Sequence, residues 1–191
     1  MNILLSAYAC EPNKGSEPEV GWKWALALSK RGHQVYVITR KNNKNIIDEY
    51  LKKNSLDNLK FIYFDFPSWI LKTIKGKSNA YAYFYIFLWQ IGIFFAIKPV
   101  LKKIKFDFIH HVTFASLRFP SFLSLYNIPF IYGPVAGGDT IPFRLRKKFS
   151  FLEKMREFIR DINNRYIKIS PFINLTLSKS HKIYVTSEET K

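Results

Sequence analysis

Short apolar runs alternate along this chain with longer stretches in which apolar residues recur at helical spacing. The runs have the length and the β-branched or aromatic content of buried strands, and they lie at 2–8, 34–39, 59–66, 106–112, 128–133 and 182–186. The longer stretches predict helices at 19–31, 44–54, 79–104, 116–125 and 149–168, with a further short helix at 171–178. Residues 66–79 and 134–148 are expected to be irregular. This alternation predicts an α/β fold, a doubly wound, Rossmann-like parallel sheet with helices on both faces, in one domain over 1–191.

The first strand, loop and helix form the most informative part of the sequence. Cys10–Pro18 is a polar loop, and it precedes a helix that Gly32 ends. Gly15 has no Cβ, so its backbone can approach a ligand phosphate closely, and the helix N-terminus adds a positive dipole. Sheets of this class bind ligands at the carboxyl ends of their strands. The loop therefore predicts a phosphate site, and a tight turn without a ligand is the alternative.

The region Phe106–Asp139 places further candidate groups at the same edge of the sheet. His110 and His111 lie near the end of the strand FDFIHHVTF, and adjacent strand residues point to opposite faces. At most one of the two histidines is therefore expected to reach a ligand, and a buried structural histidine is the alternative for either. Gly137 and Gly138 follow the next strand and permit a close backbone approach.

Two blocks of the sequence resemble the N-terminal, acceptor-side domain of family 4 glycosyltransferases, which have the GT-B fold. They are GSEPEVGWKWALALSKRGHQVYVITR in the first block, and FDFIHHVTF followed by IPFIYGPVAGGD in the second. The resemblance covers essentially the whole chain. It implies transfer of a sugar from a nucleotide-sugar donor to a glycan or lipid-linked saccharide, with retention of configuration and without a metal or another cofactor. No DxD pair and no His/Cys cluster at metal-ligand spacing occurs in the sequence.

The resemblance also implies roles for residues of the first loop. Gly15 and Ser16 match the positions that face the donor diphosphate. Lys14 replaces the first glycine of the usual family pattern, and it either meets a phosphate or is solvated. Glu17 is expected on the acceptor side, where a carboxylate can bind hydroxyl groups.

The second block carries the remaining implied roles. A histidine at this strand end contacts the donor sugar in the family, and the match favours His111, with Thr113 as a neighbouring hydroxyl. His110 stays open, because the histidine pattern is shifted by one position. Gly137 and Gly138 match the wall of the inter-domain cleft. Asp139, on the acceptor side, stands where the family has glutamate.

The C-terminus bears on how much of the enzyme this chain contains. Thr186–Glu189 is typical of a capping box that opens a helix, yet the sequence stops at Lys191, one turn later. Family 4 enzymes continue into a second Rossmann-like domain that holds most of the donor site. We therefore expect this C-terminal, donor-binding domain to be missing, and the chain alone to be inactive.

The net charge and the cysteine content indicate which kind of partner the protein binds and in which compartment it is found. The net charge is +16 and the sequence pI is near 9.9, which favours an anionic partner, although a lysine-rich genome is the alternative explanation. Nucleic acid is not expected, because the basic residues are dispersed and the aromatics gather in an apolar helix. The single cysteine fits a reducing compartment, and the N-terminus does not have the pattern of a signal peptide. We therefore expect a cytoplasmic protein.

Two segments suggest an anionic membrane surface as the partner. Ser78–Ile97 has no charged residue and is just long enough to span a bilayer, but burial on the sheet or docking in a lipid interface is favoured. A second segment begins with Arg144, Arg146, Lys147 and Lys148 and continues as a basic amphipathic helix. It suits lipid headgroups, or else packs its apolar side on the domain. We expect peripheral attachment at the inner face of the cytoplasmic membrane, and a non-catalytic membrane-binding module on the same fold is the alternative function.

Overall fold

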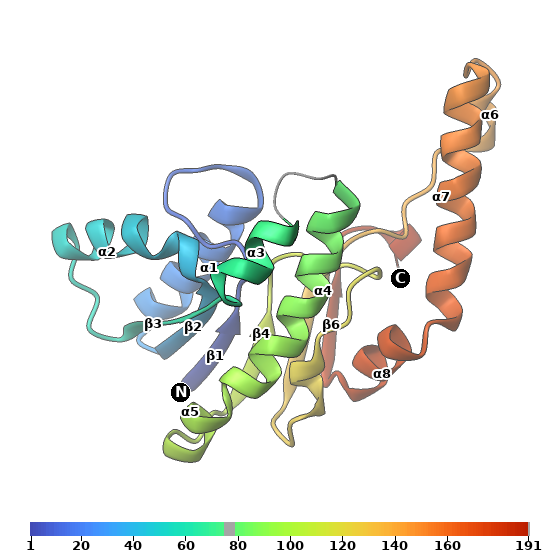
Figure 1. Cartoon of the computed structure of the whole chain (residues 1–191). Coiled ribbons are helices and arrows are strands. Elements are labelled where there is room, and N and C mark those ends of the chain that lie inside the picture. Colours follow the sequence, from blue (N-terminus) through green and yellow to red (C-terminus); the bar gives the residue numbers. More distant parts are fainter. Residues whose placement is uncertain (75–78, 191) are drawn as a thin grey trace.

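The computed structural model describes residues 1–74 and 79–190, and it has one all-parallel sheet with helices on both faces (Figure 1). The strands run in the order β3-β2-β1-β4-β5-β6 across the sheet. Their bounds are β1 Asn2–Ser6, β2 Gln34–Arg40, β3 Leu59–Phe64, β4 Phe108–His111, β5 Phe130–Val135 and β6 Lys182–Val185. The order reverses between β1 and β4, which is the switch point of a doubly wound sheet. The predicted fold class and all six predicted strands are confirmed.

Eight α-helices and three short 3-10 helices connect the strands in the described residues. The α-helices are α1 Ser16–Lys30, α2 Lys44–Lys53, α3 Ser68–Ile74, α4 Asn79–Ala96, α5 Lys98–Lys103, α6 Phe143–Arg146, α7 Phe151–Ile169 and α8 Pro171–Lys179. The 3-10 helices are η1 Lys41–Asn43, η2 Phe122–Leu125 and η3 Glu188–Thr190. Because every crossover returns to a parallel strand, the loops after the strands gather at one edge of the sheet.

The sheet separates two hydrophobic cores, and β1 contributes to both of them. Ile3 and Leu5 point to the side that carries α1 and α2, whereas Leu4 points to the side that carries α4. On the α4 side, Trp89 and Ile93 are fully buried. Burial on both faces explains why the central strands are apolar at consecutive positions.

The apolar segment at 78–97 falls mostly on α4, and Ser78 lies outside the described residues. Within those residues, Tyr81–Lys103 is the one helical stretch long and apolar enough to cross a membrane. Trp89, Ile93 and Ile97 of this stretch are fully buried in the core, so one side of it packs on the sheet. The predicted single helix at 79–104 is divided at Ile97, two residues before Pro99, which has no backbone N–H to donate.

Two local predictions were wrong. The predicted helix at 116–125 is helical only in η2, because Ser116 extends the sheet by pairing with Ala136 and Pro120 disfavours a helix before it. The expected irregular stretches instead contain α3 and α6. At the predicted capping box the structure has the short 3-10 helix η3, and the Thr186 hydroxyl donates to the Val135 carbonyl oxygen at 3.1 Å.

Candidate functional site

The loops after β1 and β4 are bound to each other at the switch point of the sheet. The Ala9 N–H donates to the Thr113 Oγ1 at 3.2 Å, and the Phe114 N–H donates to the Glu17 Oε2 at 3.2 Å. Glu17 lies in the first turn of α1, so this carboxylate joins the start of the helix to the end of β4. The structure thus brings the first predicted loop and the predicted histidine strand to one place.

The backbone at the start of α1 is open to a ligand. Asn13, Gly15 and Ser16 all have positive φ angles, of 59°, 72° and 52°. A Cβ added at Gly15 would meet no atom within 4 Å, and no side chain caps the first N–H groups of α1. Unpaired N–H groups and the helix dipole both favour an anion at such a position.

Lys14 is held by a carboxylate of its own loop. Its Nζ lies 2.8 and 2.9 Å from the two carboxylate oxygens of Glu11. Glu11 is buried, whereas the Lys14 side chain is 55% exposed. The sequence suggested that Lys14 either contacts a phosphate or is solvated. The structure adds a third arrangement, an ion pair with Glu11 within the loop.

The two histidines of β4 are buried on opposite sides of the strand, as the alternation of strand residues predicts. The His110 Nε2–H donates to the Gly133 carbonyl oxygen at 2.8 Å, and its ring meets Trp24 edge-on. The His111 Nδ1 lies 2.9 Å from the Ser6 hydroxyl oxygen. The exposed fractions are 3% for His110 and 1% for His111.

Burial sets the protonation state of this pair. Desolvation lowers the pKa of His110 to about 4, partly offset by the hydrogen bond to Gly133. Desolvation, and secondarily the neighbouring His110, lowers the pKa of His111 to about 3. Both imidazoles are therefore neutral at pH 7 and act through hydrogen bonds rather than charge. Thr113 is fully buried as well, and a ligand contact by any of the three stays a prediction.

Glycines bring the loop after β5 against the same edge. Gly137 has φ 108°, and a Cβ there would lie 3.0 Å from the Ser116 Oγ of the loop after β4. The neighbouring Ala136 N–H donates to the Ala115 carbonyl oxygen at 3.1 Å. Gly138 is partly exposed, and exposed Asp139 accepts a hydrogen bond from the Ser187 hydroxyl beyond β6. Asp139 and Glu17, the two acceptor-side candidates, have different hydrogen-bond partners among the described residues.

An arginine enclosed by aromatic rings at this edge was missed by the sequence reasoning. The Arg40 guanidinium carbon lies 5.2 Å from the ring centroid of Tyr8 and 5.1 Å from that of Tyr85. The Arg40 Nε–H donates to the Asp65 Oδ1 at 3.0 Å, and the Lys41 N–H donates to the other oxygen at 2.8 Å. The available signal was a charged residue at the carboxyl end of each of two apolar strands, Arg40 as the last residue of β2 and Asp65 directly after β3.

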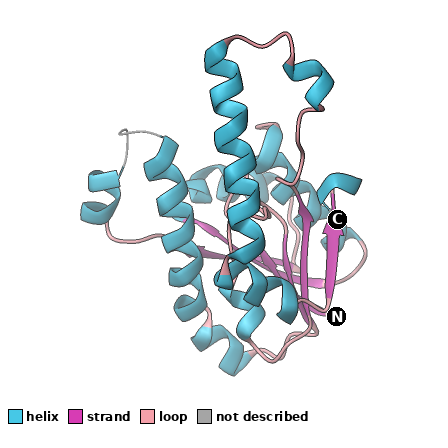
Figure 2. Cartoon of the chain, turned by 90° about the vertical axis from the view of Figure 1, so that its right-hand side faces the viewer, coloured by secondary structure: helices cyan, strands magenta, loops and turns pink. Residues whose placement is uncertain are grey.

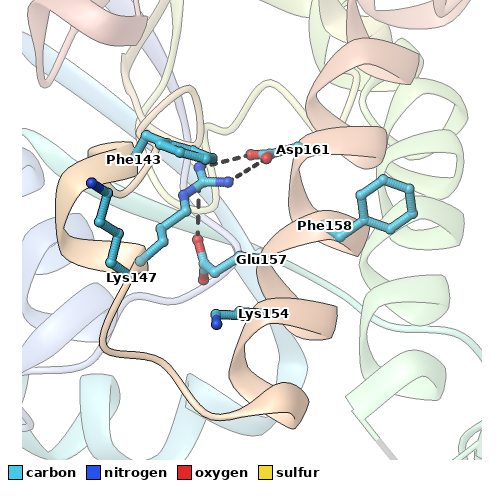
Figure 3. Close-up of a pocket in the computed structure, with 7 residues that line it drawn as sticks. Phe143, Lys147, Lys154, Glu157, Phe158 and Asp161 are labelled. Carbon is cyan, nitrogen blue, oxygen red and sulfur yellow. Dashed lines mark hydrogen bonds and ion pairs between the residues drawn. The ribbon is translucent and has the colours of Figure 1, made fainter.

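The predicted lipid-binding cations divide into two groups in the structure. Arg146 makes two hydrogen bonds to Asp161, of 2.5 and 3.1 Å, and lies 4.0 Å from the Glu157 Oε2 (Figure 3). These contacts hold α6 on α7. Arg146, Glu157 and Asp161 also line a cavity of about 420 Å³. Arg144, Lys147 and Lys148 are exposed and form no ion pair among the described residues.

Metal and thiol chemistry have no evident centre in the described part of the chain. No group of three or more histidine, cysteine, aspartate or glutamate side chains is placed there to hold a metal ion. Cys10 is fully buried, and desolvation raises the pKa of its thiol far above the ordinary value.

No model of a known protein family matches this chain, and no curated protein sequence matches it either. The resemblance to family 4 glycosyltransferases therefore rests on the motifs and the fold described above.

Proposed function

We propose that this chain is the N-terminal, acceptor-side half of a retaining GT-B glycosyltransferase that uses a nucleotide-sugar donor. The acceptor is a glycan or a lipid-linked saccharide, and a second Rossmann-like domain completes the donor site. One observation carries the proposal. The open Gly15 backbone at the uncapped start of α1 lies in a loop that is bonded to the end of β4, at the switch point of the sheet.

The chemistry of sugar transfer explains what this arrangement supplies. The leaving diphosphate must be neutralised, and preorganised N–H groups with a helix dipole do so without a metal. Gly15 and Ser16 receive the diphosphate in this proposal, and Lys14 can exchange its Glu11 partner for a phosphate oxygen. Gly137 and Gly138 form the wall of the cleft.

The residues at the end of β4 and directly after it position the donor sugar in this proposal. His111 is neutral, and its Nδ1 is held by Ser6, so the orientation of the imidazole is fixed before a ligand arrives. His110 and Thr113 hold the strand end in place through hydrogen bonds to Gly133 of β5 and to Ala9 of the loop after β1. Glu17 and Asp139 are the acceptor-side carboxylates.

The first test is to read the gene downstream of Lys191. We expect an open frame that encodes a second Rossmann-like domain with a Glu-x7-Glu motif. A stop codon at that point would contradict the proposal for a single-chain enzyme.

The second test compares two glycines that both have a positive φ angle and open space around the Cα. Gly15 and Gly32 have φ angles of 72° and 81°, and an added Cβ meets no atom within 4 Å at either position. Alanine strains the backbone at both positions, and more at Gly15, whose ψ of 173° is reached essentially only by glycine, so thermal unfolding of both variants accompanies the activity measurement. Gly32 lies in the turn between α1 and β2, at the opposite edge of the sheet. In the full-length protein, transfer of labelled sugar from a panel of nucleotide sugars to a lipid extract is measured. We expect Gly15→Ala to lower kcat/KM at least about tenfold and Gly32→Ala to leave it near wild type. Equal effects, or no transfer from any donor, would contradict the phosphate role.

A further inference from the structure

The segment 143–169, here called the arm, consists of α6, the turn that follows and α7. Figure 1 shows the arm standing beside the sheet, with α6 and the start of α7 beyond the carboxyl ends of the strands. Figure 2 shows the same projection from the side. The arm therefore reaches past the edge that carries the candidate site.

One side of α7 is apolar and lies open to solvent. Its members are 45–75% exposed, and they are Phe151, Leu152, Met155, Phe158, Ile159 and Ile162. These positions recur at intervals of three and four residues, so they form a single stripe along the helix. The alternative that the helix packs its apolar side on the domain is therefore wrong, because every member of the stripe is at least 45% exposed.

Cations border the stripe on both sides. Lys154 follows Phe151 by three residues and precedes Phe158 by four, which places it along one border of the stripe. Arg156 has the corresponding position beside Leu152 and Ile159, along the other border. Both cations are exposed, and long basic side chains at such positions extend their charge past an apolar surface.

The acidic residues of the arm are occupied elsewhere. The arm contains 9 lysines and arginines and 3 acidic residues, a net charge of +6. Glu153 accepts hydrogen bonds from the Ser150 N–H and hydroxyl, and Glu157 and Asp161 pair with arginines on the side that carries α6. The stripe consequently faces outward in a positive field.

We propose that the arm docks on an anionic lipid bilayer, with the stripe inserted at the interface and the basic residues on headgroup phosphates. An apolar helix face with aromatic residues and flanking cations fits that environment. A second copy of the chain fits poorly, because two arms of charge +6 would repel each other at the contact. The docking stands on the arm alone and holds whether or not the chain takes part in sugar transfer.

The charge contribution is tested by vesicle flotation at 0.1 M salt. The full-length protein is mixed with vesicles of phosphatidylcholine alone, or with 30 mol% phosphatidylglycerol, and the bound fraction is measured. We expect binding only with the anionic lipid. Lys147→Gln with Lys148→Gln should weaken it about fivefold per lysine, or about twenty-five-fold together. The matched control is Lys52→Gln with Lys53→Gln on exposed positions of α2, which removes the same charge from the other side of the molecule and should change binding less than about twofold.

The apolar contribution is tested in the same assay. Phe151→Ser with Phe158→Ser should weaken binding at least about tenfold, while Ile46→Ser on exposed α2 should have no effect. All of these positions are exposed, so the variants should fold, which thermal unfolding checks. Failure to float with anionic vesicles would overturn the proposal, as would equal weakening by the arm and control variants. A dimer in solution that the phenylalanine changes dissociate, without vesicle binding, would also overturn it.

Discussion

Lowering the pH from 7 to 5 should destabilise the folded chain, because His110 and His111 are buried and neutral in the fold. A histidine in the unfolded chain has a pKa near 6.5, whereas burial lowers the pKa of these two to about 4 and about 3. Between pH 6.5 and these values the unfolded state binds more protons than the folded state. The free energy of unfolding must therefore fall as the pH falls through this window.

The size of the effect follows from the two pKa shifts. At pH 5, protonation favours the unfolded chain by about 2 kcal/mol for each buried histidine, or about 4 kcal/mol for the pair. This is a large part of the total stability of a typical domain, which is about 5–15 kcal/mol. Unfolding in urea, followed by circular dichroism at pH 7, 6 and 5, measures the change.

Variants assign the effect to each histidine. His111→Asn keeps a polar group near the Ser6 hydroxyl, and His110→Gln keeps one near the Gly133 carbonyl oxygen. Each should remove about 2 kcal/mol of the difference between pH 7 and pH 5. His181→Gln, in the exposed turn before β6, is the control. A wild-type difference below about 1 kcal/mol, or variants that leave the difference intact, would refute the buried neutral pair.

Three further changes test other parts of the fold. Gln90 is fully buried and its amide has no hydrogen-bond partner among the described residues, so Gln90→Leu should stabilise the chain by about 1–2 kcal/mol and raise Tm about 3–6 °C in a thermal scan. A Cβ at Gly21 would lie 2.2 Å from the Ala9 carbonyl oxygen, so Gly21→Ala should cost about 2–3 kcal/mol in urea unfolding, more than the ~1 kcal/mol expected for Gly32→Ala. Asp65→Asn should cost about 2 kcal/mol by the same measurement, because it removes the charge that faces Arg40.

The strand pattern could be predicted because each strand carries its own signal. Buried parallel strands are short apolar runs, and the glycine-containing turns between the elements mark their ends. The Gly15 loop could be predicted for the same reason, since its position after β1 and before α1 is a local property. The helix expected at 116–125 could not be excluded locally, because the pairing of Ser116 with Ala136 joins two distant loops.

In the candidate site, too, features set by nearby residues could be predicted, whereas features set by residues distant in the sequence could not. The alternation of His110 and His111 was predictable from strand geometry. Their burial was not, because it depends on Trp24 and Tyr132, which come from α1 and β5. The Arg40 cluster was missed, since its aromatic walls lie on elements that are separated along the chain.

Helical spacing alone cannot say which surface a helix covers, and α4 and α7 illustrate why. Both have apolar residues at helical spacing, but α4 crosses back over the sheet and buries Trp89 and Ile93 in the core. The arm instead stands beside the sheet. Within the arm, Arg146 binds Asp161 fifteen residues away and thereby holds α6 on the polar side of α7. That contact engages one of the four basic residues predicted to bind lipid, and it leaves the apolar stripe of α7 uncovered by α6. The position of α6 therefore has two effects: it removes Arg146 from the cations that are free to bind lipid, and it leaves exposed an apolar surface suited to a bilayer.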